Sequence, residues 1–138
     1  MKYFSIAEFL RSDAAEKYQV SNIPSDEELL AVLNNINALV NNVLDPLRAM
    51  IARPIIITSG YRSRQVNELV GGSKTSQHLS GKAADIHVQG YTPQQMDMVY
   101  RTIQMYYDFD QLIFYPSKNI IHISWNGDKN LHESWVKA

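Results

Sequence analysis

The spacing of apolar residues changes at Pro54, and this change limits the folds that are open to the chain. Before Pro54, apolar residues recur every three or four positions, which predicts one face of a long helix that packs on a core. These residues are Leu29, Leu33, Ile36, Val40, Val43 and Leu47. After Pro54, the β-branched run Ile55–Ile57 predicts a strand, and short apolar runs at 83–88, 111–115 and 120–124 predict three more. Helices followed by strands, with one helix among the strands, predict the α+β class.

The sequence also predicts where helices start, through polar cap residues that are followed by Glu or Gln three residues later. Pro46 should interrupt the long helix towards its end, because proline lacks the N–H that a helix interior uses. The PSKN segment at 116–119 predicts a hairpin turn, whereas the tail from Trp125 carries no clear pattern. The expected architecture is a small antiparallel sheet packed against N-terminal helices, in one domain over 1–138. The predicted helix starts are Ser5 with Glu8, Ser25 with Glu28, and Thr92 with Pro93 and Gln95.

Composition excludes several classes of function. The chain has no cysteine, so it has no disulfide, no thiolate nucleophile and no zinc site of the Cys type. A net charge of −1 without a basic block argues against a nucleic-acid partner. No stretch approaches the about 18 apolar residues of a membrane span, and the first residues do not resemble a signal peptide. We therefore expect a monomer that is made in the cytoplasm and contacts no membrane, although its target can lie elsewhere.

Asp85 is the most unusual residue of the second half, because the run AADIHV places a carboxylate inside a predicted buried strand. Burying an unpaired charge is unfavourable by several kcal/mol, so a cation or strong hydrogen-bond donors should lie close to it. The partner could be an arginine or lysine. It could also be a metal ion shared with His78, seven residues earlier, and with His122 on a neighbouring strand. Two imidazoles and one carboxylate suit Zn²⁺ with a fourth position left for water.

Three segments together resemble the family of zinc D-Ala-D-Ala carboxypeptidases and L-alanyl-D-glutamate endopeptidases, which includes vancomycin-resistance D,D-peptidases and phage endolysins. They are ITSGYRS at 57–63, VGGSKTSQHLSGKAADI at 70–86 and FDQLIFYPSKNIIHIS at 109–124. The second contains S-x-H-x-x-G-x-A-x-D, and the third ends in a histidine on a predicted strand. The segments occur in the family's order with plausible gaps. The set is specific, although no single segment is.

The resemblance implies a role for each matched residue. His78, Asp85 and His122 would bind one Zn²⁺, and Arg62 would hold substrate or stabilise charge on the scissile carbonyl. Ser76 would bind near the site or order its loop, and Tyr61 would line it.

The family places a Glu or Asp as general base three residues before the last histidine. Here that position holds Asn119, which cannot accept a proton. Asp108, Asp110 and Glu133 are possible substitutes, and Asp110 can equally be structural. His87, two residues after Asp85, could be a further ligand, although the family leaves that position free.

Two functional hypotheses follow. The first is a zinc peptidase that cuts a peptide bond in the stem peptides of bacterial peptidoglycan, with a phage or prophage origin and release towards the cell wall as one possible context. The second is a non-catalytic zinc-containing module that binds peptidoglycan or a protein, which Asn119 favours. A third interpretation keeps the fold without metal and leaves Asp85 in a salt bridge. The sequence does not indicate which bond is cut.

Overall fold

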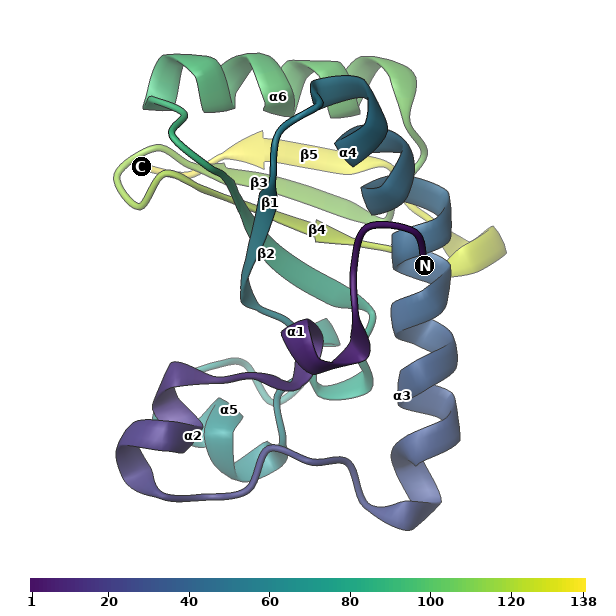
Figure 1. Cartoon of the computed structure of the whole chain (residues 1–138), viewed down its shortest axis with the longest axis vertical. Coiled ribbons are helices and arrows are strands. Elements are labelled where there is room, and N and C mark those ends of the chain that lie inside the picture. Colours follow the sequence, from purple (N-terminus) through teal and green to yellow (C-terminus); the bar gives the residue numbers. More distant parts are fainter.

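The fold is built on a five-stranded sheet with the strand order β1-β2-β4-β3-β5, in a computed structural model that covers residues 1–138 (Figure 1). The pairs β1–β2, β2–β4 and β4–β3 are antiparallel, and the pair β3–β5 is parallel. The strands are β1 (Ile55–Ser59), β2 (Ala83–Val88), β3 (Gln111–Tyr115), β4 (Ile120–Ser124) and β5 (Glu133–Val136). The α+β class is confirmed, as are the first four strands and the hairpin between β3 and β4.

The last strand adds one parallel pair to the predicted antiparallel sheet. The tail turns back so that β5 pairs Gln111 with Glu133 and Phe114 with Val136. A parallel pair needs a long connection, and here the β4 strand and the turn after it provide that connection. β5 is a largely exposed edge strand of four residues. Its alternation of apolar and polar residues is too short to be recognised in the sequence.

The chain has six α-helices, and three of them begin at the predicted caps. Ser5 and Thr92 each form a complete capping box, and the Ser25 hydroxyl accepts a hydrogen bond from the Glu28 N–H. The helices are α1 (Ile6–Leu10), α2 (Asp13–Tyr18), α3 (Asp26–Leu39), α4 (Asp45–Ile51), α5 (Arg64–Leu69) and α6 (Pro93–Tyr106). None of them is long and apolar enough to cross a membrane.

The long α-helix is interrupted just before Pro46, as expected, although the chain stays helical there. A π-helical turn over Val40–Leu44 joins α3 to α4, and the Asp45 N–H donates to the Val40 carbonyl five residues back. The wider turn shifts the helical hydrogen-bond register. Pro46 therefore falls in the first turn of α4, where a missing N–H is harmless.

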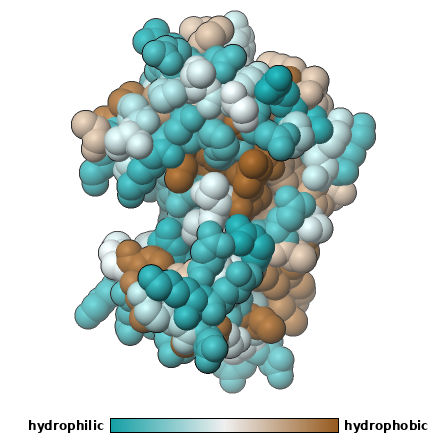
Figure 2. Space-filling model, turned by 60° about the vertical axis from the view of Figure 1, so that its left-hand side comes forward, coloured by the Kyte–Doolittle hydropathy of each residue, from teal (hydrophilic) through white to brown (hydrophobic).

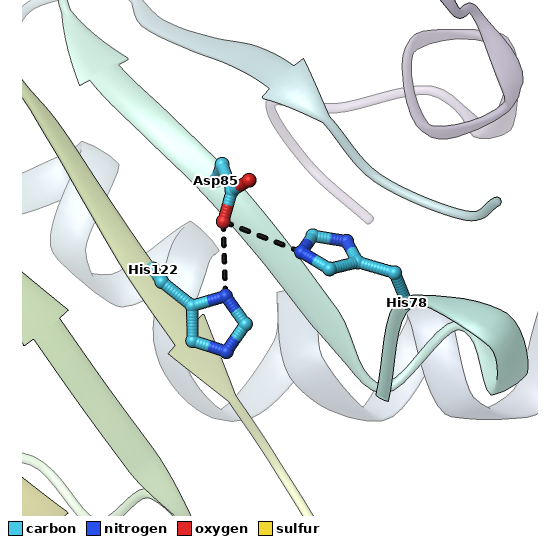
Figure 3. Close-up of side chains that lie close together, drawn as sticks. All are labelled: His78, Asp85 and His122. Carbon is cyan, nitrogen blue, oxygen red and sulfur yellow. Dashed lines mark hydrogen bonds and ion pairs between the residues drawn. The ribbon is translucent and has the colours of Figure 1, made fainter. Parts of the chain in front are cut away.

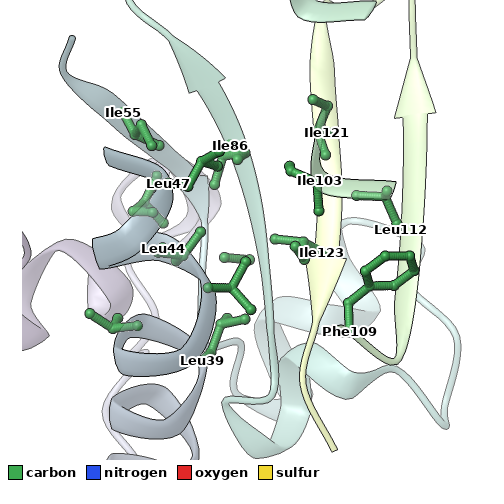
Figure 4. Packing of buried hydrophobic residues seen from close by; sticks show 14 of the residues in the cluster. Leu39, Leu44, Leu47, Ile55, Ile86, Ile103, Phe109, Leu112, Ile121 and Ile123 are labelled. Carbon is green, nitrogen blue, oxygen red and sulfur yellow. The ribbon is translucent and has the colours of Figure 1, made fainter. Parts of the chain in front are cut away.

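The two faces of the sheet have different environments. Because side chains alternate along a strand, Ile121 and Ile123 point into the core while His122 between them points to the opposite face. α3, α4 and α6 contribute to the core, where Leu39, Leu44 and Ile103 pack with strand residues (Figure 4). The helices therefore cover one face of the sheet and leave the other open.

The predicted apolar face is confirmed from Ile36 onwards, whereas Leu33 is only partly buried and Leu29 is exposed. Ile36, Val40, Val43 and Leu47 are fully buried. Leu29 is exposed, because the first turns of α3 extend below the sheet (Figure 1).

Candidate metal centre

Asp85, His122 and His78 come together on the open face of the sheet (Figure 3). Asp85 on β2 lies directly opposite His122 on β4 in the antiparallel register. His78 belongs to a 3₁₀ turn, Gln77–Ser80, that precedes β2 and brings its ring over the strand pair. The structure therefore unites the three residues that the sequence predicted as metal ligands.

The donor atoms are spaced as a single ion requires. Nδ1 of His122 lies 2.9 Å from Oδ1 of Asp85, and Nε2 of His78 lies 3.3 Å from the same oxygen. All three ligand atoms lie within 4.8 Å of one another. A tetrahedral ion with bonds of about 2.0–2.1 Å separates its ligand atoms by about 3.3 Å, so a small shift suffices to seat Zn²⁺.

A hydrogen bond fixes the state of His78. Its Nδ1 lies 2.7 Å from the carbonyl oxygen of Gly60, which can only accept, so Nδ1 carries the proton. Nε2 is then the ring nitrogen that faces Asp85, and it is the atom that would bind a metal ion. Such a backbone partner is the usual support of a metal-binding histidine, and His78 itself is only 3% exposed.

The position of that carbonyl depends on Gly60 itself. A Cβ at residue 60 would lie 2.7 Å from the backbone oxygen of Phe9 and 2.8 Å from its Cα. These contacts are too short for any side chain. The bulge that precedes Gly60, where the β1–β2 register shifts between Ile57 and Ser59, bends the chain towards His78.

Asp85 is held in its ionised form. Burial alone would raise the pKa of its carboxyl group, but hydrogen bonds from His122 and His78 outweigh burial and hold the pKa well below its usual range. Nη2 of Arg62 lies 3.6 Å from Oδ2 of Asp85. The salt bridge and the imidazole contacts therefore occur together, and Asp85 presents a negative charge to any cation in the site.

Arg62 is fixed against the site by three polar contacts. Besides Asp85, Nε donates to the Ser59 hydroxyl at 3.1 Å and Nη1 donates to Oδ1 of Asn67 at 3.3 Å. Burial lowers the pKa of the guanidinium, while the charge of Asp85 opposes this shift. An arginine remains charged under these conditions, so it is a fixed cation beside the ligand group.

The three donors open into a cavity of about 750 Å³. Figure 2 shows the hollow between the part of the molecule built on the sheet and the part built around α2 and α5. Segment 71–78 lies on one side of the cavity, and the β3–β4 hairpin lies on the other. A chain as wide as a peptide can enter such a space.

Two further predicted residues line the cavity with structural contacts. Ser76 caps the 3₁₀ turn by accepting a hydrogen bond from the His78 N–H at 3.2 Å, so it orders the ligand loop. Asp110 is buried, and both of its carboxylate oxygens accept hydrogen bonds. One comes from Nε2 of Gln77 at 2.8 Å and the other from the Leu131 N–H at 2.9 Å.

Two expectations place residues at the site that the structure places elsewhere. Tyr61 is only 3% exposed and belongs to the core, and its N–H donates to the Phe9 carbonyl at 2.8 Å. Asn119 adopts a left-handed backbone conformation in the hairpin turn, with φ of 55°. Its side-chain amide donates to the Tyr91 carbonyl at 2.8 Å, on the far side of the hairpin. Neither residue lines the cavity.

The remaining candidates also lie outside the ligand group. His87 donates from Nδ1 to the backbone carbonyl of Asn119 at 3.0 Å, and His132 stacks on Phe109 with ring centroids 4.1 Å apart. Asp108 and Glu133 are exposed and do not line the cavity.

Sequence reasoning missed Gln77, Lys118 and Lys137, which all line the cavity. Gln77 adjoins His78 in the sequence, and Lys118 lies in the predicted hairpin turn, so both had a weak positional signal. Lys137 had none, because only the parallel pairing of β5 brings it to the site.

Two imidazoles and one carboxylate beside a fixed arginine, on the floor of an open cavity, define a candidate centre for one metal ion. Residues 2–124 match the family model of peptidase M15, so the chain belongs to this family of peptidases. The resemblance drawn from the three motifs is thereby confirmed. No curated protein matches the chain.

Proposed function

We propose that the chain is a zinc peptidase that cuts a peptide bond in bacterial cell-wall muropeptides, as a D,D-carboxypeptidase or a stem-peptide endopeptidase. One Zn²⁺ per chain would be held by Nε2 of His78, a carboxylate oxygen of Asp85 and Nδ1 of His122. We further propose that residues 1–138 act as one domain and as a monomer. The observation that carries the proposal is the spacing of these three donor atoms, all within 4.8 Å of one another at a cavity.

When bound, Zn²⁺ supplies Lewis acidity that polarises a carbonyl group and activates water near neutral pH. The chain's own residues would do the rest. Arg62 would face the oxygen that becomes negative during cleavage, as a cation that is already oriented by Ser59 and Asn67. The Gly60 carbonyl would keep the His78 ring in the tautomer that binds metal.

Asp110 is better suited to position residues than to accept a proton. Each of its oxygens already accepts a hydrogen bond, and through Gln77 it holds the 3₁₀ turn that carries His78. Asp85 and Asp110 are the only acidic side chains that line the cavity. Since neither is a free carboxylate, we expect slow turnover.

The test is hydrolysis of defined stem peptides and purified peptidoglycan, followed by mass spectrometry of the products. The zinc-loaded protein should release a single class of fragment, and a chelator should stop the reaction until zinc is returned. His122→Ala should be inactive, whereas His87→Ala is the matched control, because His87 is a histidine on the same sheet outside the ligand group. No cleavage of any stem peptide by zinc-loaded protein would refute the proposal.

A second candidate is a non-catalytic zinc-containing module that binds peptidoglycan or a protein. The absence of a free carboxylate beside the ligand group is the observation that favours it. It predicts one bound zinc and saturable binding to peptidoglycan without any released fragment. A pull-down on insoluble peptidoglycan, combined with analysis of the supernatant, separates binding from cleavage.

A further inference from the structure

The cavity carries more positive than negative side-chain charge. Three cationic side chains line it, Arg62, Lys118 and Lys137, against the two carboxylates of Asp85 and Asp110. Both carboxylates are already engaged by protein groups, Asp85 by Arg62 and two imidazoles and Asp110 by two N–H donors. The two lysines are therefore left without a carboxylate partner.

Both lysines are placed by ordered parts of the fold. Lys118 lies in the β3–β4 turn, with Nζ 5.5 Å from the centroid of the Tyr115 ring, and its backbone N–H donates to the Tyr115 carbonyl at 3.2 Å. Lys137 follows β5, and its backbone N–H donates to the Phe114 carbonyl at 2.8 Å. Neither lysine forms an ion pair.

Two strand ends bring these lysines to the same cavity. Tyr115 is the last residue of β3, and β5 runs parallel to β3, so both strands finish at the same edge of the sheet. Like charges gathered at one site repel each other unless an anion is shared between them. Lys137 also lies after the residues that match the family model, so this feature is additional to the matched region.

We propose that Lys118 and Lys137 form an anion subsite that binds a free carboxylate of the peptide held in the cavity. The inference rests on the proposed function only in treating the cavity as the place where a peptide binds. It narrows the substrate to acidic peptides. The carboxylate can be the terminal group of the peptide or a side-chain group along it. These two sources would place the cut bond at different distances from the bound carboxylate.

The experiment measures equilibrium binding to the metal-free full chain by calorimetry, so that no cleavage interferes. The ligands are a stem pentapeptide of peptidoglycan with all carboxylates free and the same peptide with every carboxylate converted to an amide. Two intermediate peptides carry the amide only at the terminus or only along the peptide. They assign the source of the carboxylate that the subsite binds.

The free peptide should bind roughly tenfold more tightly than the fully amidated one, and added salt should reduce the difference. The double variant Lys118→Gln, Lys137→Gln should abolish the preference. Lys17→Gln is the matched control, because Lys17 also lies over a tyrosine ring, at 5.3 Å from Tyr18, but does not line the cavity.

Equal affinity for the free and the amidated peptide would overturn the inference, as would a preference that survives in the double variant. Either result leaves the proposed function intact if the zinc-loaded protein still cleaves stem peptides. Conversely, a charge preference in binding without any cleavage would support the subsite while it refutes the peptidase.

Discussion

Replacement of Asp110 distinguishes a residue that positions the metal ligands from one that takes part in proton transfer. The buried carboxylate accepts hydrogen bonds from Gln77 and from the Leu131 N–H. Asp110→Ala removes both bonds and leaves two donors unpaired. A hydrogen bond to a charged group contributes about 1.5–3 kcal/mol, so the loss of two should lower the free energy of unfolding by about 3–6 kcal/mol.

Asp110→Asn should be far milder, because the Gln77 side chain can compensate. Oε1 of Gln77 is buried without a hydrogen-bond donor. If the Gln77 amide turns over, this oxygen accepts from the amide group that the substitution introduces, and the oxygen facing Leu131 is unchanged. We expect a loss of about 1 kcal/mol and nearly unaltered zinc affinity.

Three measurements test this prediction together: urea unfolding followed by tryptophan fluorescence, zinc affinity by competition with a chelator, and turnover of a stem peptide. A positioning role predicts that Asp110→Ala weakens folding and zinc binding, while Asp110→Asn keeps both and retains most of its turnover. The reasoning is refuted if the two variants are equally unstable. It is also refuted if Asp110→Asn binds zinc normally and turns over about 100-fold more slowly, because that is the signature of a general base.

Further predictions concern the support of the site, its charge and the core. Gly60→Ala should weaken zinc binding, because the added Cβ would meet the Phe9 backbone and displace the carbonyl that orients His78. An unchanged zinc affinity would show that this carbonyl is dispensable. In metal-free protein, the depressed pKa of Asp85 contributes stability that is fully present above the unfolded value of about 4 and is lost as the pH falls below it. Unfolding at a series of pH values should therefore show a steeper acid loss for the parent chain than for Asp85→Asn. Ile123→Ala should lower the free energy of unfolding by about 2–5 kcal/mol through a core cavity, as urea titration would measure, and a loss below about 1 kcal/mol would contradict the packing seen in Figure 4.

Much of the fold can be predicted from the sequence where local patterns decide it. Short apolar runs mark β1 to β4, and alternation along β4 correctly separates His122 from its two buried isoleucine neighbours. β5 could not be predicted, because its position depends on a long-range parallel pairing and its own pattern is weak.

The candidate site likewise has parts that the sequence predicts and parts that it does not. Three motifs identify His78, Asp85 and His122, and register then places Asp85 opposite His122. Tyr61 and Asn119 do not line the cavity, and nearness in sequence does not give the direction of a side chain in a turn. Tyr61 is buried in the core beside Phe9, and Asn119 has a left-handed backbone conformation with its side-chain amide on the Tyr91 carbonyl. Both depend on contacts that only the folded chain contains.

The central claim is that His78, Asp85 and His122 bind one metal ion, and the metal content of the protein tests it most directly. Protein purified without added zinc should be analysed by mass spectrometry for metals, beside His122→Ala and the control His87→Ala. We predict close to one equivalent of zinc in the parent chain and in His87→Ala, and almost none in His122→Ala. No retained zinc in the parent chain, or equal zinc in all three proteins, would contradict the account.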